Sequence, residues 1–269
     1  MNITLQNIEN MRRNGFHFEF GELFDQTFNN YKKIALMQGL VMLVVLLAFT
    51  IILGSVAGLA IGVGEMTEFF TDMQVNGMGP TTIVINLLVG VVGAGLAAPF
   101  TAGLLKMAHM AEENKEFGFS TAFDYYNSRH FTDLFLTGVY IALFTSGVAA
   151  LVNVLNESYA FLKIGLGIAN FILNAVVAVL TIFAIPLVIF GNMNAIDAIK
   201  SSFAIGWSKF WMILGLGIVI IIIACLGIFG FCLGIFFTLP LIYAMEYIMY
   251  RNAFGIKEEN EIDEIGSEG

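Results

Sequence analysis

The sequence predicts an all-α polytopic membrane protein with about six transmembrane helices. Of its 269 residues, 58% are hydrophobic and only 12% are charged. The mean hydropathy is +0.84, which is far above the range of soluble globular domains. Uncharged apolar runs recur along the chain, and they reach the ~20 residues that a helix needs to cross a bilayer.

Charged residues divide the sequence into six expected spans. They cover residues 34–63, 82–108, 133–156, 162–191, 209–226 and 228–250. The last two lie in a run, 210–245, that holds no charged residue at all. As one helix this run would be ~54 Å long, against a hydrocarbon core of ~30 Å, so it must fold back on itself. Gly227 and Gly230 are the expected corner, because glycine turns most easily.

The basic residues predict the orientation of these spans. Eleven of the twelve fall on one side, and Lys163 alone falls on the other. The eleven are Arg12, Arg13, Lys32, Lys33, Lys106, Lys115, Arg129, Lys200, Lys209, Arg251 and Lys257. Because lysine and arginine accumulate in cytoplasmic loops, we expect both termini in the cytoplasm and the protein in a bacterial inner (cytoplasmic) membrane.

The charge distribution also predicts the domain organisation. We expect a short cytoplasmic segment over residues 1–17 and a membrane domain over residues 18–256. Residues 257–269 hold six acidic residues against Lys257 and contribute −5 of the net charge of −9. This tail has almost nothing to bury, so we expect it to be disordered.

An internal threefold repeat is predicted within the membrane domain, with copies near 18–116, 117–192 and 193–256. Three segments align on constant offsets of 99 and 176 residues. Phe20, Leu23, Thr27, Tyr31 and Gly39 align with Phe119, Ala122, Tyr126, His130 and Gly138, and with Ile196, Ile199, Phe203, Trp207 and Gly215. The first four positions of each copy have the spacing of one helical face. Each copy is therefore expected to be an amphipathic helix followed by a helical hairpin.

This aromatic and aliphatic stripe permits two arrangements. The three short helices could lie in the membrane interface with the stripe on lipid, or the stripe could pack on the helix bundle. Phe24 and Phe123 extend the stripe in the first two copies, whereas Lys200 interrupts it in the third. Both arrangements give the same architecture, a collar of short helices on the cytoplasmic side.

Three of the four prolines recur in the second span of each pair. They are Pro99, Pro186 and Pro240. Within a helix, proline removes a hydrogen bond and kinks the chain. We expect three kinks at matching positions that shape the bundle.

Two short motifs resemble a known family. Residues 21–28 read Gly-Glu-Leu-Phe-Asp-Gln-Thr-Phe, and residues 195–203 read Ala-Ile-Asp-Ala-Ile-Lys-Ser-Ser-Phe before Lys209-Phe210-Trp211. These motifs resemble the six-helix bacterial membrane family that includes the membrane domain of glycerophosphodiester phosphodiesterases. The resemblance implies a stand-alone envelope membrane protein. The phosphodiesterase activity of fused members belongs to a separate soluble barrel and is not implied.

Polar residues at membrane depth are the candidate functional residues, because an ionisable group in hydrocarbon is costly. Lys106 lies seven residues after Pro99, and Glu246 lies six residues after Pro240. The repeat would place them at similar depth, where they could form an ion pair. Alternatively, Lys106 extends to the headgroups and Glu246 meets Arg251 or water.

Two asparagines form a second candidate polar site. Asn170 and Asn174 are four residues apart on one helical face. Such amides usually form hydrogen bonds between spanning helices, so interhelical contacts are the expected role.

No catalytic constellation, metal site or cofactor site is predicted. His109, Glu112 and Glu113 share a helical face, but no His-Glu-x-x-His motif exists and the chain has three histidines. Residues 109–116 are better interpreted as a solvated charged loop. No basic stripe suitable for nucleic acid is present either.

The function expected from the sequence is that of a non-enzymatic membrane protein in envelope maintenance, or a transporter-like or accessory subunit. Two other classes remain open: a membrane-embedded enzyme acting on lipid, and a scaffold whose acidic tail recruits a cytosolic partner. The expected partners are membrane lipids and a protein partner or a second copy of the chain.

Overall fold

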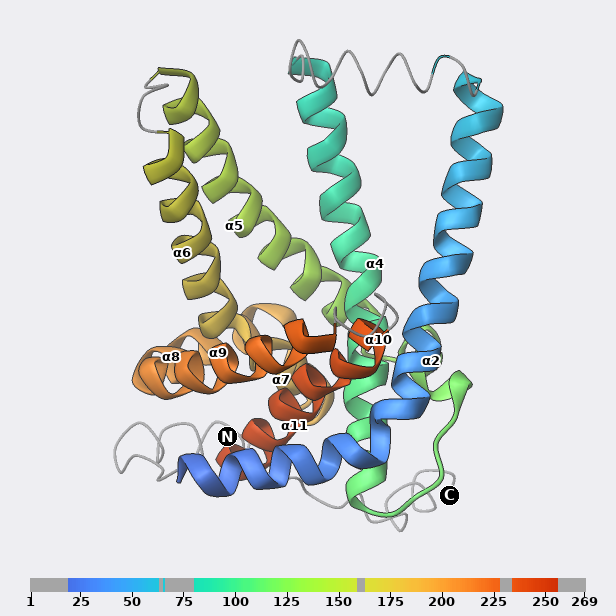
Figure 1. Ribbon diagram of the computed structural model, residues 1–269, viewed down its shortest axis with the longest axis vertical. Coiled ribbons are helices and arrows are strands. Elements are labelled where there is room, and N and C mark those ends of the chain that lie inside the picture. The colour runs from blue at the N-terminus through green and yellow to red at the C-terminus, as the bar shows by residue number, and fades with distance from the viewer. Residues whose placement is uncertain (1–18, 63–64, 66–79, 159–162, 228–233, 256–269) are drawn as a thin grey trace, which may run out of the picture.

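The computed structural model describes residues 19–62, 65, 80–158, 163–227 and 234–255. Every regular element in this part of the chain is a helix (Figure 1), which confirms the predicted fold class. In chain order these are α2 (Phe20–Ile61), α4 (Pro80–Glu112), the 3₁₀ helix η1 (Phe119–Asn127), α5 (Phe131–Ser158), α6 (Lys163–Thr181), α7 (Ala184–Ile189), α8 (Ala195–Ser208), α9 (Phe210–Leu226), α10 (Gly234–Thr238) and α11 (Pro240–Phe254).

Four helical stretches of the described chain are long and apolar enough to cross a membrane. They are Phe20–Val56, Leu87–Glu112, Phe131–Ala149 and Ile164–Ile189. A fifth arises if α8 and α9, which meet at 90°, are counted as one broken span. The six predicted spans stay a prediction, because α9 has only 17 residues and the last segment is divided into α10, of 5 residues, and α11, of 15.

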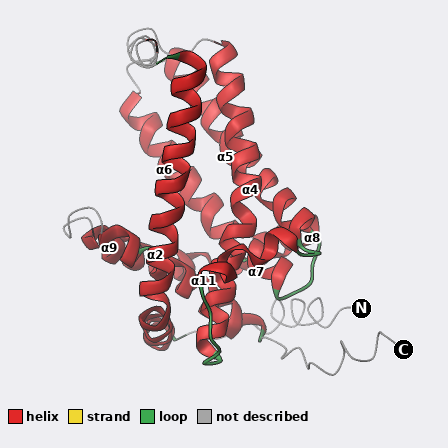
Figure 2. Cartoon of the chain, turned by 90° about the vertical axis from the view of Figure 1, so that its right-hand side faces the viewer, coloured by secondary structure: helices red, strands yellow, loops and turns green. Residues whose placement is uncertain are grey.

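The helices form two zones. The greater parts of α2, α4, α5 and α6 stand upright, whereas the short helices gather at one end, where α2 also begins (Figure 1). The same division is visible after a quarter turn (Figure 2). The largest buried cluster lies at the end with the short helices and includes Leu105, Leu187 and Tyr250. By contrast, Phe171 on the upright part of α6 is 77% exposed, as expected of a side chain that faces hydrocarbon.

The first predicted stripe packs on the bundle through its middle, whereas Phe20 at its start is 44% exposed. Leu23 and Thr27 are buried, and Ile34 continues the buried face where α2 leaves the short-helix zone. In the second copy, Ala122 of η1 is also buried, and its carbonyl oxygen would lie 2.2 Å from a Cβ placed at Gly103 of α4. A side chain at Gly103 would therefore displace η1 from α4.

The uncharged run after Lys209 folds back where the sequence predicts. A Cβ at Gly227 would lie 2.9 Å from the carbonyl oxygen of Gly234, so the end of α9 lies against the start of α10. The second predicted corner residue, Gly230, lies outside the described residues.

The three prolines occupy different positions relative to helix ends. Pro99 lies inside the continuous helix α4. Pro186 lies inside the short helix α7, just after the break that separates α7 from α6. Pro240 is the first residue of α11 and follows the break after α10. Two of the three thus accompany helix breaks, because a proline cannot donate the hydrogen bond that would continue the helix.

Candidate functional site

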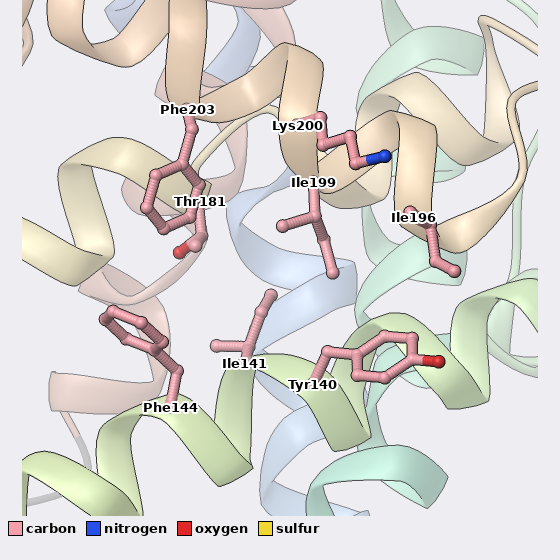
Figure 3. Close-up of a pocket in the computed structure, with 8 residues that line it drawn as sticks. All are labelled: Tyr140, Ile141, Phe144, Thr181, Ile196, Ile199, Lys200 and Phe203. Carbon is pink, nitrogen blue, oxygen red and sulfur yellow. The ribbon is translucent and has the colours of Figure 1, made fainter.

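A cavity of about 590 Å³ opens between α5, α6 and α8 (Figure 3). We call it the α5–α8 pocket. Its lining consists of Tyr140, Ile141, Phe144, Thr181, Ile196, Ile199, Lys200 and Phe203. This volume is typical of small-molecule sites, which span roughly 300–1,000 Å³.

Helix geometry explains which side chains reach the pocket. Residues three, four or seven apart share one face of a helix, so α8 presents Ile196, Ile199, Lys200 and Phe203 together. Three of these residues are the stripe predicted for the third copy. This stripe faces an open space: Ile196 is exposed, and Ile199 and Phe203 are only partly buried.

Hydrogen bonds at both ends fix α8 beside this space. At its start, the amide of Ala195 donates to Asp133 of α5 over 3.1 Å, and the side chain of Asn194 accepts from the amide of Asp197 over 3.0 Å. Further along, the buried Ser202 hydroxyl donates to the carbonyl of Leu180 over 2.7 Å and accepts from the amide of Phe183 over 3.1 Å. Ser202 thereby binds α8 to the break between α6 and α7.

The α5–α8 pocket has a polar end and an aromatic end. The Lys200 amine and the Tyr140 hydroxyl point to one side, and Phe144 and Phe203 lie on the other (Figure 3). The two phenylalanine rings meet edge to face, with centroids 6.0 Å apart and planes at 82°, a favoured aromatic geometry. No ion pair involves Lys200 among the described residues. The cavity therefore combines one available cation with an apolar interior.

A second polar group joins α2, α4 and α11, and we call it the Glu112 cluster. It consists of Gln26, Asn30, Glu112 and Arg251. Arg251 donates one hydrogen bond to the Glu112 carboxylate and a second to the Gln26 side-chain oxygen, over 2.8 Å. The Asn30 amide donates to Glu112 over 3.2 Å and to the carbonyl of Ala108 over 2.8 Å. The cluster ties the first part of α2 and the last helix to the end of α4.

The interpretation of residues 109–116 as a solvated loop is wrong for residues 109–112, which belong to α4. His109 lies within α4, and its ring nitrogen Nδ1 is 3.1 Å from the hydroxyl of the buried Tyr247. Glu113 lies 3.5 Å from the other ring nitrogen and 2.9 Å from Lys115. The packing of α11 against α4 covers this face, so these polar groups interact with protein. In the described part of the chain, no group of three histidine, cysteine or acidic side chains could hold a metal ion.

Lys106 has a different partner from the predicted one. Its amine lies 2.8 Å from Asp124 of η1 and 6.0 Å from the ring centre of Tyr125. No ion pair between Lys106 and Glu246 occurs among the described residues. The reason is that η1 packs on α4 and brings the Asp124 carboxylate to the Lys106 amine.

The side chains of Asn170 and Asn174 form hydrogen bonds within α6. The Asn174 amide donates to the carbonyl and to the side-chain oxygen of Asn170, both over 2.9 Å. Both residues lie on α6. The predicted interhelical role has no hydrogen bond to support it in the described residues.

Sequence reasoning missed the residues that α5 and α6 contribute to the pocket. Tyr140, Phe144 and Thr181 have no distinguishing pattern in an apolar helix, and only the position of α8 makes them a site. One feature of the sequence pointed to the pocket: Lys200 is a charged residue in an otherwise apolar stripe.

Fold and pocket together define a class: an all-helical, multi-pass membrane protein with an amphipathic cavity beside its spanning helices. No protein-family model, curated protein or solved structure matches the chain.

Proposed function

We propose that this protein is a non-enzymatic, multi-pass protein of the bacterial inner membrane that binds a membrane lipid in the α5–α8 pocket. Through that lipid it serves envelope maintenance, or acts as a transporter-like or accessory subunit. The observation that carries the proposal is the pocket itself, an apolar cavity whose lining includes the exposed side of a spanning helix. The distribution of basic residues supports a cytoplasmic location for both termini.

The chemistry of the lining favours hydrocarbon over water. A buried water needs two to four polar partners. The Thr181 hydroxyl already donates to the carbonyl of Val177 over 2.8 Å. Apart from Lys200 and the Tyr140 hydroxyl at one end, the remaining lining is aliphatic and aromatic. An acyl chain would restore the van der Waals contacts that an empty apolar cavity lacks.

The location of the pocket favours a lipid over a soluble ligand. Phe144 and Ile196 are about half exposed, and α5 and α6 both contain stretches apolar enough to span a bilayer. A lipid can therefore enter sideways from the membrane. The proposed threefold repeat and the resemblance to the six-helix family agree with such a role.

Native mass spectrometry of the detergent-purified protein tests this proposal. We expect about one retained lipid per chain, and we expect Ile199→Trp to lower retention strongly because the larger indole obstructs the middle of the cavity. Ile168→Trp is the matched control, since Ile168 is 57% exposed on the same membrane-spanning stretch as Thr181 but does not line the pocket. Equal lipid retention in both variants would contradict the proposal.

The same sample discriminates two other classes. A chemically altered lipid among the products would favour a membrane-embedded enzyme that acts on lipid. A stoichiometric cytosolic protein, lost when residues 257–269 are deleted, would favour a scaffold that recruits its partner through the acidic tail.

A further inference from the structure

We infer that the α5–α8 pocket selects anionic lipids. The headgroup phosphate lies against the Lys200 amine and the Tyr140 hydroxyl, and one acyl chain runs past Ile199 toward Phe144 and Phe203. This inference rests on the proposed function, because it names the lipid class that the same pocket takes.

The first argument is a difference between the three predicted copies. Lys200 aligns with Phe24 of the first predicted copy and Phe123 of the second. Phe24 is partly buried against the main core and stacks on Phe28 with ring centres 6.3 Å apart. Phe123 packs on Phe100 with ring centres 5.6 Å apart. In both cases an aromatic ring packs against its neighbours, whereas the third copy has a cation beside an open cavity.

The second argument is charge complementarity. Two acidic residues near the start of α8 accept hydrogen bonds from neutral amides and form no ion pair with Lys200: Asp133 accepts from the amide of Ala195, and Asp197 accepts from the side chain of Asn194 over 2.8 Å. Lys200 has no ion pair among the described residues. A phosphate would supply the missing counter-charge, and the cationic group of a zwitterionic headgroup would be repelled by the same amine.

The third argument is the polarity of the cavity along its length. A phospholipid has one charged end and apolar chains, and the pocket has its cation and phenol at one end and two packed rings at the other (Figure 3). The lysine stem can lie along the apolar lining while its amine reaches the headgroup level. Only one orientation of the lipid matches both ends.

The test compares two lipids that share their acyl chains and differ in the headgroup, one anionic and one zwitterionic. Protein in detergent is titrated with equal amounts of phosphatidylglycerol and phosphatidylcholine of identical acyl chains, and native mass spectrometry counts each complex. We expect a preference of about fivefold for phosphatidylglycerol, the effect of one basic side chain near a membrane surface. Lys200→Met should bring the ratio close to one while total lipid bound stays similar, and Lys200→Arg should restore it.

A matched control separates the pocket from general surface charge. Lys32 is an exposed lysine on α2 that lies over the Phe28 ring, so Lys32→Met removes the same charge outside the pocket. If Lys32→Met lowers the preference as much as Lys200→Met, the selectivity is not a property of this site and the inference is overturned.

The outcomes for the two proposals are distinguishable. If Ile199→Trp blocks binding but Lys200→Met leaves the preference unchanged, lipid binding stands and selection by Lys200 is refuted. If Ile199→Trp binds both lipids as well as the wild type does, the pocket is not the lipid site and both proposals fail.

Discussion

Arg251, in the last turn of α11, donates a hydrogen bond to Glu112, the final residue of α4, across 139 positions of sequence. The same guanidinium binds Gln26 near the start of α2. One side chain therefore holds three helices together at the end of the molecule where its core lies. Burial makes the contact consequential, because the Arg251 side chain is 25% exposed and that of Glu112 is 34% exposed.

Breaking this ion pair is expected to destabilise the fold in a non-additive way. Arg251→Met leaves Glu112 partly buried without its cation, and Glu112→Gln does the reverse. A hydrogen bond to a charged group contributes about 1.5–3 kcal/mol. We expect each single variant to lower the melting temperature in detergent by roughly 4–8 °C, and the double variant to lose much less than the sum.

Thermal unfolding of the wild type, both single variants and the double variant provides the measurement. Lys32→Met serves as a control for the loss of a basic residue outside the Glu112 cluster. Simply additive shifts would mean that Arg251 and Glu112 contribute independently and do not hold the helices as a pair.

The partner of Lys106 can be identified in the same way. We expect Lys106→Met to couple with Asp124→Asn, because the two charged groups lie 2.8 Å apart, and to show no coupling with Glu246→Gln. The magnitude is small, about 0.5 kcal/mol, since both side chains are more than one third exposed and surface ion pairs contribute little. Coupling to Glu246 instead would support the pair that the repeat predicts.

The contact between α4 and η1 makes a steric prediction. Gly103→Ala places a methyl group 2.2 Å from the carbonyl oxygen of Ala122, so η1 must shift. Overpacking of this kind costs about 1–3 kcal/mol. Gly93→Ala on the same helix is the control, because a Cβ there meets nothing within 4 Å. Equal melting temperatures for the two variants would show that η1 can move away from α4 without loss of stability.

Features that depend on local composition could be predicted from the sequence. The all-helical class and the four spanning stretches follow from long apolar runs. The fold-back after α9 follows from run length, and Gly227 marks it. Each of these needs only neighbouring residues and the thickness of a bilayer.

Features that depend on the packing of distant segments could not be predicted. Glu112 and Arg251 are an ordinary acid and base until α11 packs on α4. Likewise, the α5–α8 pocket depends on the two hydrogen bonds by which Ser202 holds α8 against the break after α6. No sequence pattern predicts these hydrogen bonds. Lys106 shows the same limit, since no sequence pattern predicts that η1 brings Asp124 within 2.8 Å of its amine.

The orientation of the molecule in the membrane is the remaining prediction. Glu65 follows the end of α2 at Ile61, and the exposed Ser120 belongs to η1, which packs on α4. The end of α2 lies at the opposite end of the upright helices from the short helices (Figure 1). In a background without Cys225 and Cys232, we expect Glu65→Cys to react with a membrane-impermeant maleimide in intact cells. We expect Ser120→Cys to react only after permeabilisation, because the distribution of basic residues predicts that η1 is cytoplasmic. The opposite labelling pattern would invert the topology. It would also move the Lys200 end of the pocket to the outer leaflet, where the lipid selected by that amine would have to be found.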